Sequence, residues 1–354
     1  MTRVGSWHYA FRNAPYHVHG GLTAQWGEFL RASRDVTRSH GATRVGILRE
    51  LMDGQWRYGF TPKDLLALGL LQRPKREWKR WVGTVDMYKA QRFWNPSPHR
   101  SILSDKRRFS KHFSGLMDGR RFHFERPKDL GGLEAWIRET NSKELISKPA
   151  QGQAGRGVLV HRVSFERGAM LLDGTPNLER ALTGLTLPRL FEPRLENHPS
   201  INEVHSGSLN TVRVLTFRES GGRPHVFAAR IRFGCGTATD NMAAGGLAAP
   251  VSLSSGTVSQ VAVSTGLAGP EEHSRHPLTN VEIVGLKVPH WQAILELAKA
   301  AAERTPQTRS VGWDIAVTPQ RPVLLEGNHN WCKILWQVPV NQGLRSEVEE
   351  MLRA

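Results

Sequence analysis

Cysteine is almost absent from this chain, since only Cys235 and Cys332 occur among its 354 residues. Two cysteines so far apart form neither a disulfide framework nor a metal-ligand spacing, so we expect a cytoplasmic protein in a reducing compartment. Long apolar runs are also missing, because Met242–Leu253 is short and interrupted by glycines. The sequence therefore predicts no membrane span, and residues 1–13 lack the apolar core of a signal peptide.

Acidic residues are scarce relative to basic ones. The chain has 32 Asp and Glu against 48 Lys and Arg, which gives a formal net charge of +16. This excess favours anionic partners, among them nucleotide phosphates, acidic sugars and nucleic acid. Nucleic acid is the least favoured, because we find no nucleic-acid-binding motif. The densest basic cluster, Arg73–Trp81, is either a phosphate-binding patch or a solvated helix face, and we favour the second interpretation.

Residues 1–100 are predicted to be mostly helical and basic. Helix-like apolar spacing occurs at Trp26–Ser33 and Thr43–Leu51, and Thr61-Pro62 is typical of a helix start. The prolines of Asn95–Pro98 predict the end of this helical pattern, and we place a domain boundary near residue 100. Tryptophans are expected to anchor packing against a second domain, rather than to stack on sugars, at Trp56, Trp78, Trp81 and Trp94.

A glycine-rich loop is predicted to connect two strands. Lys148 ends the strand Leu145–Lys148, and Gly152, Gly155 and Gly157 follow it. Glycines let the backbone approach an anion closely, and a lysine at the entry of the loop can neutralise phosphate oxygens. The spacing matches neither a dinucleotide fingerprint nor a P-loop. Taken alone, the loop fits either an ordinary glycine-rich hairpin or a phosphate-binding loop.

The stretch Ser310–Trp331 is predicted to form a hairpin. Its strands are Val311–Val317 and Pro322–Gly327, and its turn is centred at Gln320. One face of the hairpin is expected to be apolar and to carry Trp313, Ile315, Val317, Val323 and Leu325. Small residues leave room for bulky groups at Gly312, Ala316 and Gly327.

The other face of the hairpin is a candidate metal site. Pairing outward from the turn places Asp314 opposite Glu326, and Asn328 follows on the same face. Two carboxylates and an amide oxygen that face one point suit Mg²⁺ bridged to phosphates, with Mn²⁺ as the alternative, better than zinc. A solvated polar face without a metal is the other interpretation.

These parts occur in the order of a known family. The chain resembles the ATP-grasp superfamily, and within it the sugar-transfer-associated branch related to the α-L-glutamate ligases. The resemblance covers roughly residues 100–340. It depends on Asp105-Lys106, on Lys148-Pro149 with Gly152, Gly155 and Gly157, on Leu190-Phe191-Glu192-Pro193, on Asn210-Thr211-Val212-Arg213, on Asp240-Asn241 with Gly245-Gly246, and on Gly312-Trp313-Asp314 with Glu326 and Asn328. Each element is weak alone, whereas the six in this order are specific.

The resemblance implies an α+β fold of the ATP-grasp type, in which two α+β lobes grip ATP. We accordingly divide the chain into a mostly helical N-terminal region, residues 1–100, and two lobes. The first lobe, residues 101–189, would carry the ATP-binding lysines and the glycine-rich loop. The second lobe, residues 190–354, would carry the metal site.

The resemblance also implies roles for individual residues. ATP would be bound by Lys106, Lys148, Gly152, Gly155, Gly157, Phe191 and Glu192. Adenine would meet the backbone of the strand around Phe191, and Glu196 is a candidate for the ribose. Mg²⁺ would be held by Asp314, Glu326 and Asn328. The acceptor carboxylate or the migrating phosphoryl group would meet Arg213, Arg232 and Asn241. Arg230 is a further candidate there, and a surface ion pair is the alternative for both Arg230 and Arg232. Asp240–Gly246 would be a flexible loop over the acceptor.

The implied activity is that of an ATP-dependent carboxylate–amine ligase, which forms an amide or peptide bond through an acyl phosphate and releases ADP and phosphate. Its substrates would be small or glycan-linked acids and amines, themselves anionic. The alternative keeps the ATP site and transfers a phosphoryl group to a sugar or another small acceptor. For either reaction, we expect Asp314→Ala or Glu326→Ala to abolish turnover and to leave the fold intact.

Overall fold

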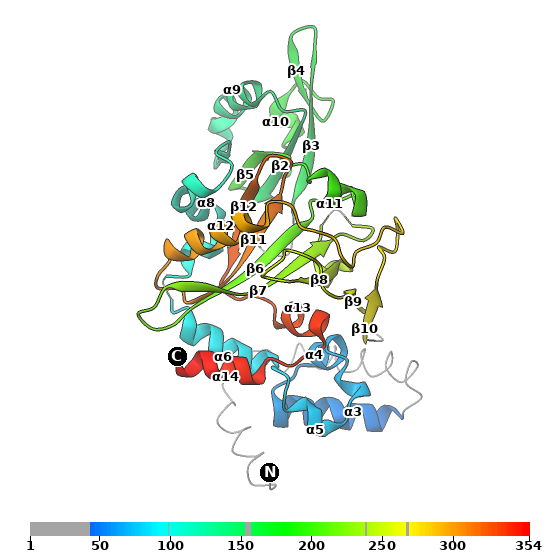
Figure 1. The fold of residues 1–354 in the computed structure, drawn as a ribbon. Coiled ribbons are helices and arrows are strands. Elements are labelled where there is room, and N and C mark those ends of the chain that lie inside the picture. The colour runs from blue at the N-terminus through cyan, green and yellow to red at the C-terminus, as the bar shows by residue number, and fades with distance from the viewer. Residues whose placement is uncertain (1–42, 98, 153–156, 238, 267–268) are drawn as a thin grey trace.

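The computed structural model describes residues 43–97, 99–152, 157–237, 239–266 and 269–354. The predicted helix Trp26–Ser33 lies outside these residues. The described chain forms two antiparallel sheets with helices beside them, and further helices lie beneath the larger sheet (Figure 1). Within the described residues, no helix is both long and apolar enough to cross a lipid bilayer.

The described part of the N-terminal region, from residue 43 onward, is helical, as expected. Its elements are α3 (Arg44–Asp53), η1 (Gly54–Tyr58), α4 (Pro62–Ala67), η2 (Leu70–Gln72), α5 (Lys75–Trp78) and α6 (Thr84–Trp94). The predicted helix start is confirmed, because the Thr61 hydroxyl accepts a hydrogen bond from the backbone N–H of Asp64 and the Asp64 carboxylate accepts one from that of Thr61. Arg76, Lys79 and Arg80 are exposed around α5, as expected of a solvated helix face.

The tryptophans of this region pack into a core that it shares with the larger sheet. The buried Trp94 ring lies 5.8 Å from that of Phe217 and stacks at 6.3 Å on that of Trp331. Trp78 and Trp81 belong to the same apolar cluster. The prediction fails for Trp56, which is 38% exposed. The cluster also contains residues of the C-terminal helices α13 (Lys333–Gln337) and α14 (Arg345–Arg353), so both ends of the described chain pack together.

Asn95 ties the end of α6 to the predicted hairpin. Its Nδ2 donates hydrogen bonds of 2.7 Å to the carbonyls of Ser310 and His329, and its Oδ1 accepts one of 3.1 Å from the Ser310 N–H. These contacts lie where the two hairpin strands diverge, because the outermost register pair is Gly312 with Asn328. Asn95 is completely buried, and its side-chain amide supplies the hydrogen bonds that these backbone groups of Ser310 and His329 do not receive from each other.

The smaller, five-stranded sheet has the order β1-β5-β2-β3-β4 and includes residues 190–193, which we expected in the second lobe. Its strands are β1 (Phe122–Phe124), β2 (Glu144–Pro149), β3 (Leu159–Glu166), β4 (Ala169–Leu172) and β5 (Arg189–Pro193). One face packs on α9 (Leu130–Thr140) and α10 (Leu178–Ala181) through a separate apolar cluster.

Two short helices, α7 (Ser101–Ser104) and α8 (Lys106–His112), connect the N-terminal region to the first lobe, and η3 (Ser114–Leu116) and η4 (Pro127–Asp129) lie nearby in sequence. α8 begins at Lys106 because the Asp105 carboxylate accepts hydrogen bonds from the backbone N–H groups of Arg107 and Arg108. Hydrogen bonding to the Arg107 guanidinium lowers the pKa of Asp105 to about 2.

Asp105→Asn should destabilise the protein in a pH-dependent way, since asparagine keeps a capping oxygen and loses the charge. The folded pKa of Asp105 is depressed, so its stabilisation is present at neutral pH and is lost as the pH falls through the folded pKa of about 2. We expect urea unfolding to show a loss of about 1–2 kcal/mol near neutral pH, shrinking in acid. A difference that does not change with pH would contradict this account.

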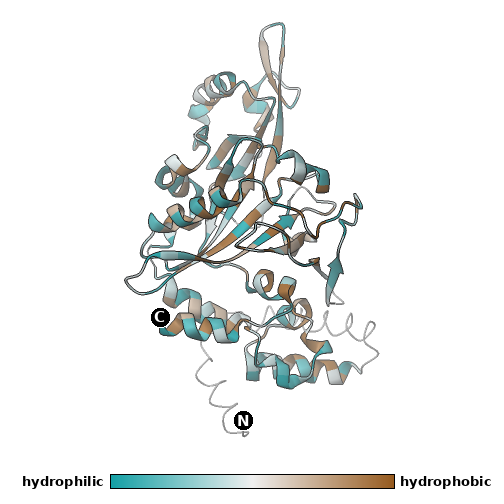
Figure 2. Ribbon diagram, viewed as in Figure 1, coloured by the Kyte–Doolittle hydropathy of each residue, from teal (hydrophilic) through white to brown (hydrophobic). Residues whose placement is uncertain are grey.

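The larger, seven-stranded sheet has the order β10-β9-β8-β7-β6-β11-β12. Its strands are β6 (Thr211–Arg218), β7 (Pro224–Phe233), β8 (Leu247–Val251), β9 (Ala262–Gly266), β10 (Gly269–His273), β11 (Ser310–Val317) and β12 (Pro322–Asn328). Helix α12 (Trp291–Glu303) covers one face of this sheet. Figure 2 shows hydrophilic and hydrophobic residues alternating along α12. The remaining elements are α11 (Pro199–Val204), η5 (Met242–Ala244) and η6 (Val338–Val340).

The hairpin register is the predicted one at its polar end and differs further along. Asp314 pairs with Glu326, as expected, but a β-bulge follows and pairs Ile315 with Leu324. The bulge inserts one residue, so it exchanges the faces of the two leucines. Leu324 is completely buried on the apolar face, and Leu325, which we predicted there, is only half-buried on the opposite side.

Candidate functional site

A cleft brings together three separate parts of the chain. Lys106 enters it from α8, Lys148 and Gly152 from β2 and the loop after it, and Glu326 and Asn328 from β12. The space, counted to its open mouth, is about 510 Å³. Five residues predicted to bind a nucleotide or a metal therefore line one cleft, with cations opposite oxygen donors.

Apolar side chains line another part of this cleft. Phe109 and Met117 come from α8 and the segment after it, and Leu190 and Leu325 come from the two sheets. Phe191 belongs to the strand that we expected to meet adenine through its backbone. Its side chain does not line the cleft and is completely buried in the apolar core beside the five-stranded sheet. Successive residues of a strand point to opposite faces, so Leu190 faces the cleft and Phe191 faces away from it.

Lys148 is held at the cleft by a carboxylate. Its Nζ lies 2.5 Å from Glu192 Oε1, and Arg121 Nε lies 3.0 Å from the other oxygen of Glu192. Burial alone would raise the pKa of Glu192, but the charges of Lys148 and Arg121 outweigh it and lower that pKa. Glu192 is therefore an anion that orients Lys148, and no sequence motif pointed to Arg121. Glu196, the ribose candidate, is exposed and does not line the cleft.

Lys106 contacts the entry of the glycine-rich loop. Its Nζ donates a hydrogen bond of 2.9 Å to the Gly152 carbonyl, and burial lowers its pKa while the charge of Glu326 opposes the shift. At the exit of the loop, the Gly157 carbonyl accepts a hydrogen bond of 2.6 Å from Arg189 Nη2. Gly152 and Gly157 have φ values of +133° and +71°, where side chains are disfavoured. Gly155 lies outside the described residues.

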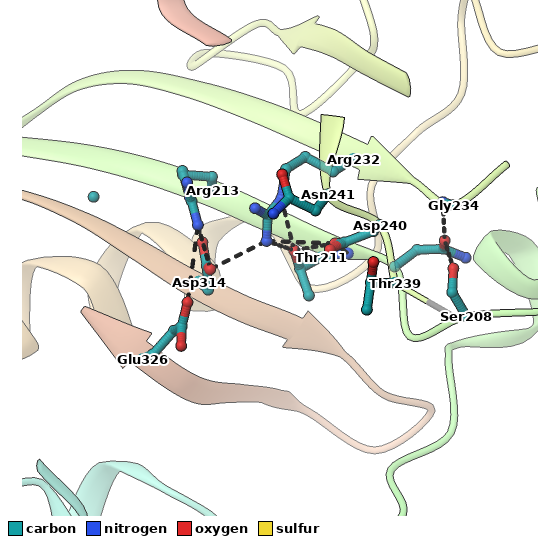
Figure 3. Close-up of polar contacts among 12 residues, drawn as sticks. Ser208, Thr211, Arg213, Arg232, Gly234, Thr239, Asp240, Asn241, Asp314 and Glu326 are labelled. Carbon is teal, nitrogen blue, oxygen red and sulfur yellow. Dashed lines mark hydrogen bonds and ion pairs between the residues drawn. The ribbon is translucent and has the colours of Figure 1, made fainter. Parts of the chain in front are cut away.

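Asp314 is almost fully buried on β11, between two guanidinium groups. Arg213 donates from Nε and Nη2 to the two carboxylate oxygens, and Arg232 Nη2 lies 3.1 Å from Oδ2 (Figure 3). Burial would raise the pKa of Asp314, but the charges of both arginines hold it well below its ordinary value. Arg213 and Arg232, which we predicted to face the acceptor, thus pair with Asp314, one of the three residues predicted to bind the metal.

The donor set of the hairpin fits a divalent cation. Glu326 faces Asp314, and both burial and the Asp314 charge raise its pKa above the ordinary value. A divalent cation would relieve this repulsion between two carboxylates. Asn328 Nδ2 lies 3.3 Å from Glu326 Oε1, so the amide is within reach of the pair. No cluster of three His, Cys, Asp or Glu side chains suited to a metal occurs in the described part of the chain, and the fit depends on Asn328 as third donor.

The small residues of the hairpin make room for the protein's own side chains. A Cβ at Gly312 would lie 3.1 Å from the Cβ of Trp331, and a Cβ at Gly327 would lie 2.7 Å from the Trp313 ring and 3.0 Å from Leu103. The bulky groups expected from the sequence are therefore these side chains. They pack the two faces of β11 next to the carboxylates.

The segment Asp240–Gly246, predicted as a flexible loop, is anchored at its start. The Asp240 carboxylate accepts hydrogen bonds from the backbone N–H and the hydroxyl of Thr211. The Asn241 Oδ1 accepts one of 3.0 Å from the Ala243 N–H and caps η5, so this side chain has a structural use that we did not predict.

The Arg230 side chain lies in the interior, against a tryptophan ring. It is buried, which excludes a surface ion pair, and its guanidinium group lies 5.3 Å from the centre of the Trp336 ring. It donates hydrogen bonds to the carbonyls of Ala229 and Trp336. Burial lowers its pKa to about 10.

Solved structures with a similar arrangement share little sequence with this chain. N5-carboxyaminoimidazole ribonucleotide synthetase from Thermotoga maritima is 10% identical, with a TM-score of 0.42, over 76% of this chain and 56% of that one. The ATP-grasp ligase PsnB is 14% identical, with a TM-score of 0.42, over 73% and 62%. D-alanine–D-alanine ligase from Bacillus anthracis is 12% identical, with a TM-score of 0.43, over 73% and 68%. The chain thus spans less than two thirds of the length of the synthetase and of PsnB.

Sequence comparison gives the assignment. No curated protein matches the chain significantly. The model of the family described as sugar-transfer associated ATP-grasp matches residues 89–353, which is well over half of the chain. The α+β fold with its helical N-terminal region, the cleft and the hairpin agree with this match. The chain belongs to the sugar-transfer associated ATP-grasp family and has the ATP-grasp fold.

Proposed function

We propose that this protein is an ATP-dependent carboxylate–amine ligase, which forms an amide or peptide bond and releases ADP and phosphate. The observation that carries the proposal is the cleft, where Lys106 and Lys148 lie opposite Glu326 and Asn328. The membership of the chain in the ATP-grasp family supports ATP as the nucleotide. The acid and the amine would be small or glycan-linked molecules.

Nucleotide binding would use both parts of the cleft. Phe109, Met117 and Leu325 offer an apolar surface to the adenine ring. Lys106 and Lys148 would neutralise phosphate oxygens as point charges. Asp314, Glu326 and Asn328 would hold Mg²⁺ or Mn²⁺, which supplies charge neutralisation and Lewis-acid catalysis when bound.

The reaction would have two steps. An oxygen of the acceptor carboxylate attacks the γ-phosphorus of ATP, the bond to the bridging oxygen breaks, and ADP leaves with its electron pair. The amine then attacks the acyl carbon, phosphate leaves, and the nitrogen loses a proton. In this scheme Arg213 and Arg232 orient the carboxylate and stabilise the charge that develops.

The reaction itself tests the proposal. The protein is incubated with ATP, Mg²⁺ and panels of acids and amines, and ADP is measured with each substrate omitted in turn. We expect ADP formation to require both the acid and the amine, and mass spectrometry to find the condensed amide. ADP formed with an alcohol or sugar alone, together with a phosphorylated product, would replace the ligase by a phosphoryl-transfer enzyme.

Lys148→Met should raise the KM for ATP by about tenfold or more, because a positive charge within reach of the phosphates is lost. The fold should persist, since Glu192 keeps its ion pair with Arg121. Steady-state kinetics at varied ATP and a thermal unfolding curve check both points. Lys299→Met on the exposed side of α12 is the matched control. An unchanged KM in Lys148→Met would remove this lysine from the ATP site.

A further inference from the structure

One guanidinium group of the second lobe is shared between two carboxylates. Arg232 Nη2 lies 3.1 Å from Asp314 Oδ2 and 3.4 Å from Asp240 Oδ2. All three residues are buried, so water cannot replace either partner freely. The position of this guanidinium between the two carboxylates therefore decides how much positive charge Asp314 receives.

Thr211 fixes that position. Its hydroxyl accepts hydrogen bonds of 3.1 Å and 2.6 Å from Nε and Nη2 of Arg232, which faces it in the register of β6 and β7. The same hydroxyl donates to Asp240, and the Thr211 N–H donates to Asp240 Oδ2 at 2.9 Å (Figure 3). One neutral side chain thus holds both the guanidinium and its second carboxylate.

A cation at the hairpin has to share Asp314 with these arginines. Both oxygens of Asp314 already accept from Arg213, and Oδ2 also faces Arg232. Positive charge so close to a metal ligand lowers its affinity for a cation. The closer Arg232 lies to Asp314, the weaker cation binding should be.

We propose that Thr211 and Asp240 are positioning residues: they hold Arg232 away from full pairing with Asp314 and thereby set the affinity of the hairpin for a divalent cation. This inference depends on the proposed function, because it takes Asp314 and Glu326 as cation ligands. The shorter of the two Arg232 contacts is already with Asp314, so a guanidinium released from Thr211 closes on that carboxylate.

Mn²⁺ binding without nucleotide tests the inference, with the free-Mn²⁺ signal followed by electron paramagnetic resonance. Arg232→Met should bind Mn²⁺ more tightly, and Asp240→Asn more weakly. Each of these two variants changes the net charge near Asp314, and that alone would change Mn²⁺ affinity in the same direction. The decisive variant is therefore Thr211→Val, which leaves the net charge unchanged. It should weaken Mn²⁺ binding by about three- to tenfold, the value of a buried hydrogen bond. Thr211→Ser, which keeps the hydroxyl, should bind Mn²⁺ like the wild type.

Two controls separate the possible failures. Thr216→Val removes another buried hydroxyl from β6, one that contacts Val311 and Trp313, and should leave Mn²⁺ binding unchanged. Glu326→Gln should abolish Mn²⁺ binding. If it does, and Thr211→Val binds like Thr216→Val, the positioning inference is wrong and the metal site stands. If wild type and Glu326→Gln bind Mn²⁺ equally or not at all, the metal site fails and the inference with it.

Discussion

Glu326→Gln is expected to abolish ADP formation and at the same time to stabilise the protein in the absence of divalent cations. Loss of one carboxylate from the donor set leaves the phosphate charge uncompensated and should lower turnover by about a hundredfold or more. The gain in stability follows from the raised pKa of Glu326, because burial and the charge of Asp314 disfavour its ionised form in the folded state. The neutral amide of glutamine avoids both the burial of a charge and the repulsion by Asp314.

Coupled ADP assays and thermal unfolding in the presence of a chelator measure the two effects on the same preparation. The matched control is Glu282→Gln, which makes the same chemical change at an exposed ion pair with Arg275 and should alter neither quantity. A Glu326→Gln variant that keeps near-normal turnover would remove Glu326 from the metal set. A variant that loses both activity and stability would show that Glu326 supports the fold.

Asp314→Asn is expected to have the opposite effect on stability. Asp314 is the carboxylate that Arg213 and Arg232 share, and removing its charge leaves two buried guanidinium groups without that partner. Loss of one side of a buried ion pair costs about 3–5 kcal/mol. This expectation replaces the simpler one drawn from the sequence, that substitution of Asp314 abolishes turnover and leaves the fold intact.

Denaturant unfolding of wild type and Asp314→Asn gives this difference directly, and its pH dependence has a definite sign. The folded pKa of Asp314 lies below its ordinary value, so its stabilisation is present at neutral pH and is lost in strong acid, where the two proteins should converge. The double variant Arg213→Met/Asp314→Leu, which replaces the pair by apolar side chains, should recover stability without recovering activity. Equal stability of wild type and Asp314→Asn would contradict this account.

Local periodicity in the sequence predicted the parts of the site that depend on neighbours along the chain. Alternation about the turn at Gln320 placed Asp314 opposite Glu326, and the structure has this pair. The same alternation failed for Leu325, because a β-bulge adds a residue that no hydrophobic pattern announces. The resemblance identified the strand around Phe191, and the structure adds that the Phe191 side chain faces the core while Leu190 lines the cleft.

Contacts between distant segments could not be predicted from the residues alone. Arg121 reaches Glu192 across 71 positions, and Arg213 reaches Asp314 across 101. The sequence indicated three candidate arginines, Arg213, Arg230 and Arg232, and a loop beginning at Asp240. Only the pairing of strands shows which of these charges meet, and therefore that Asp240 is a fixed partner of Thr211.

The buried amide of Asn95 joins the helical region to the hairpin that lines the cleft. It occupies the point where β11 and β12 part, and it is bonded to Ser310 and to His329, which lines the cleft. A protein shortened to begin after this residue would retain every charged group assigned above. It would nevertheless lack the three hydrogen bonds that Asn95 makes at the open end of the hairpin, and we expect that end, beside the cleft, to loosen.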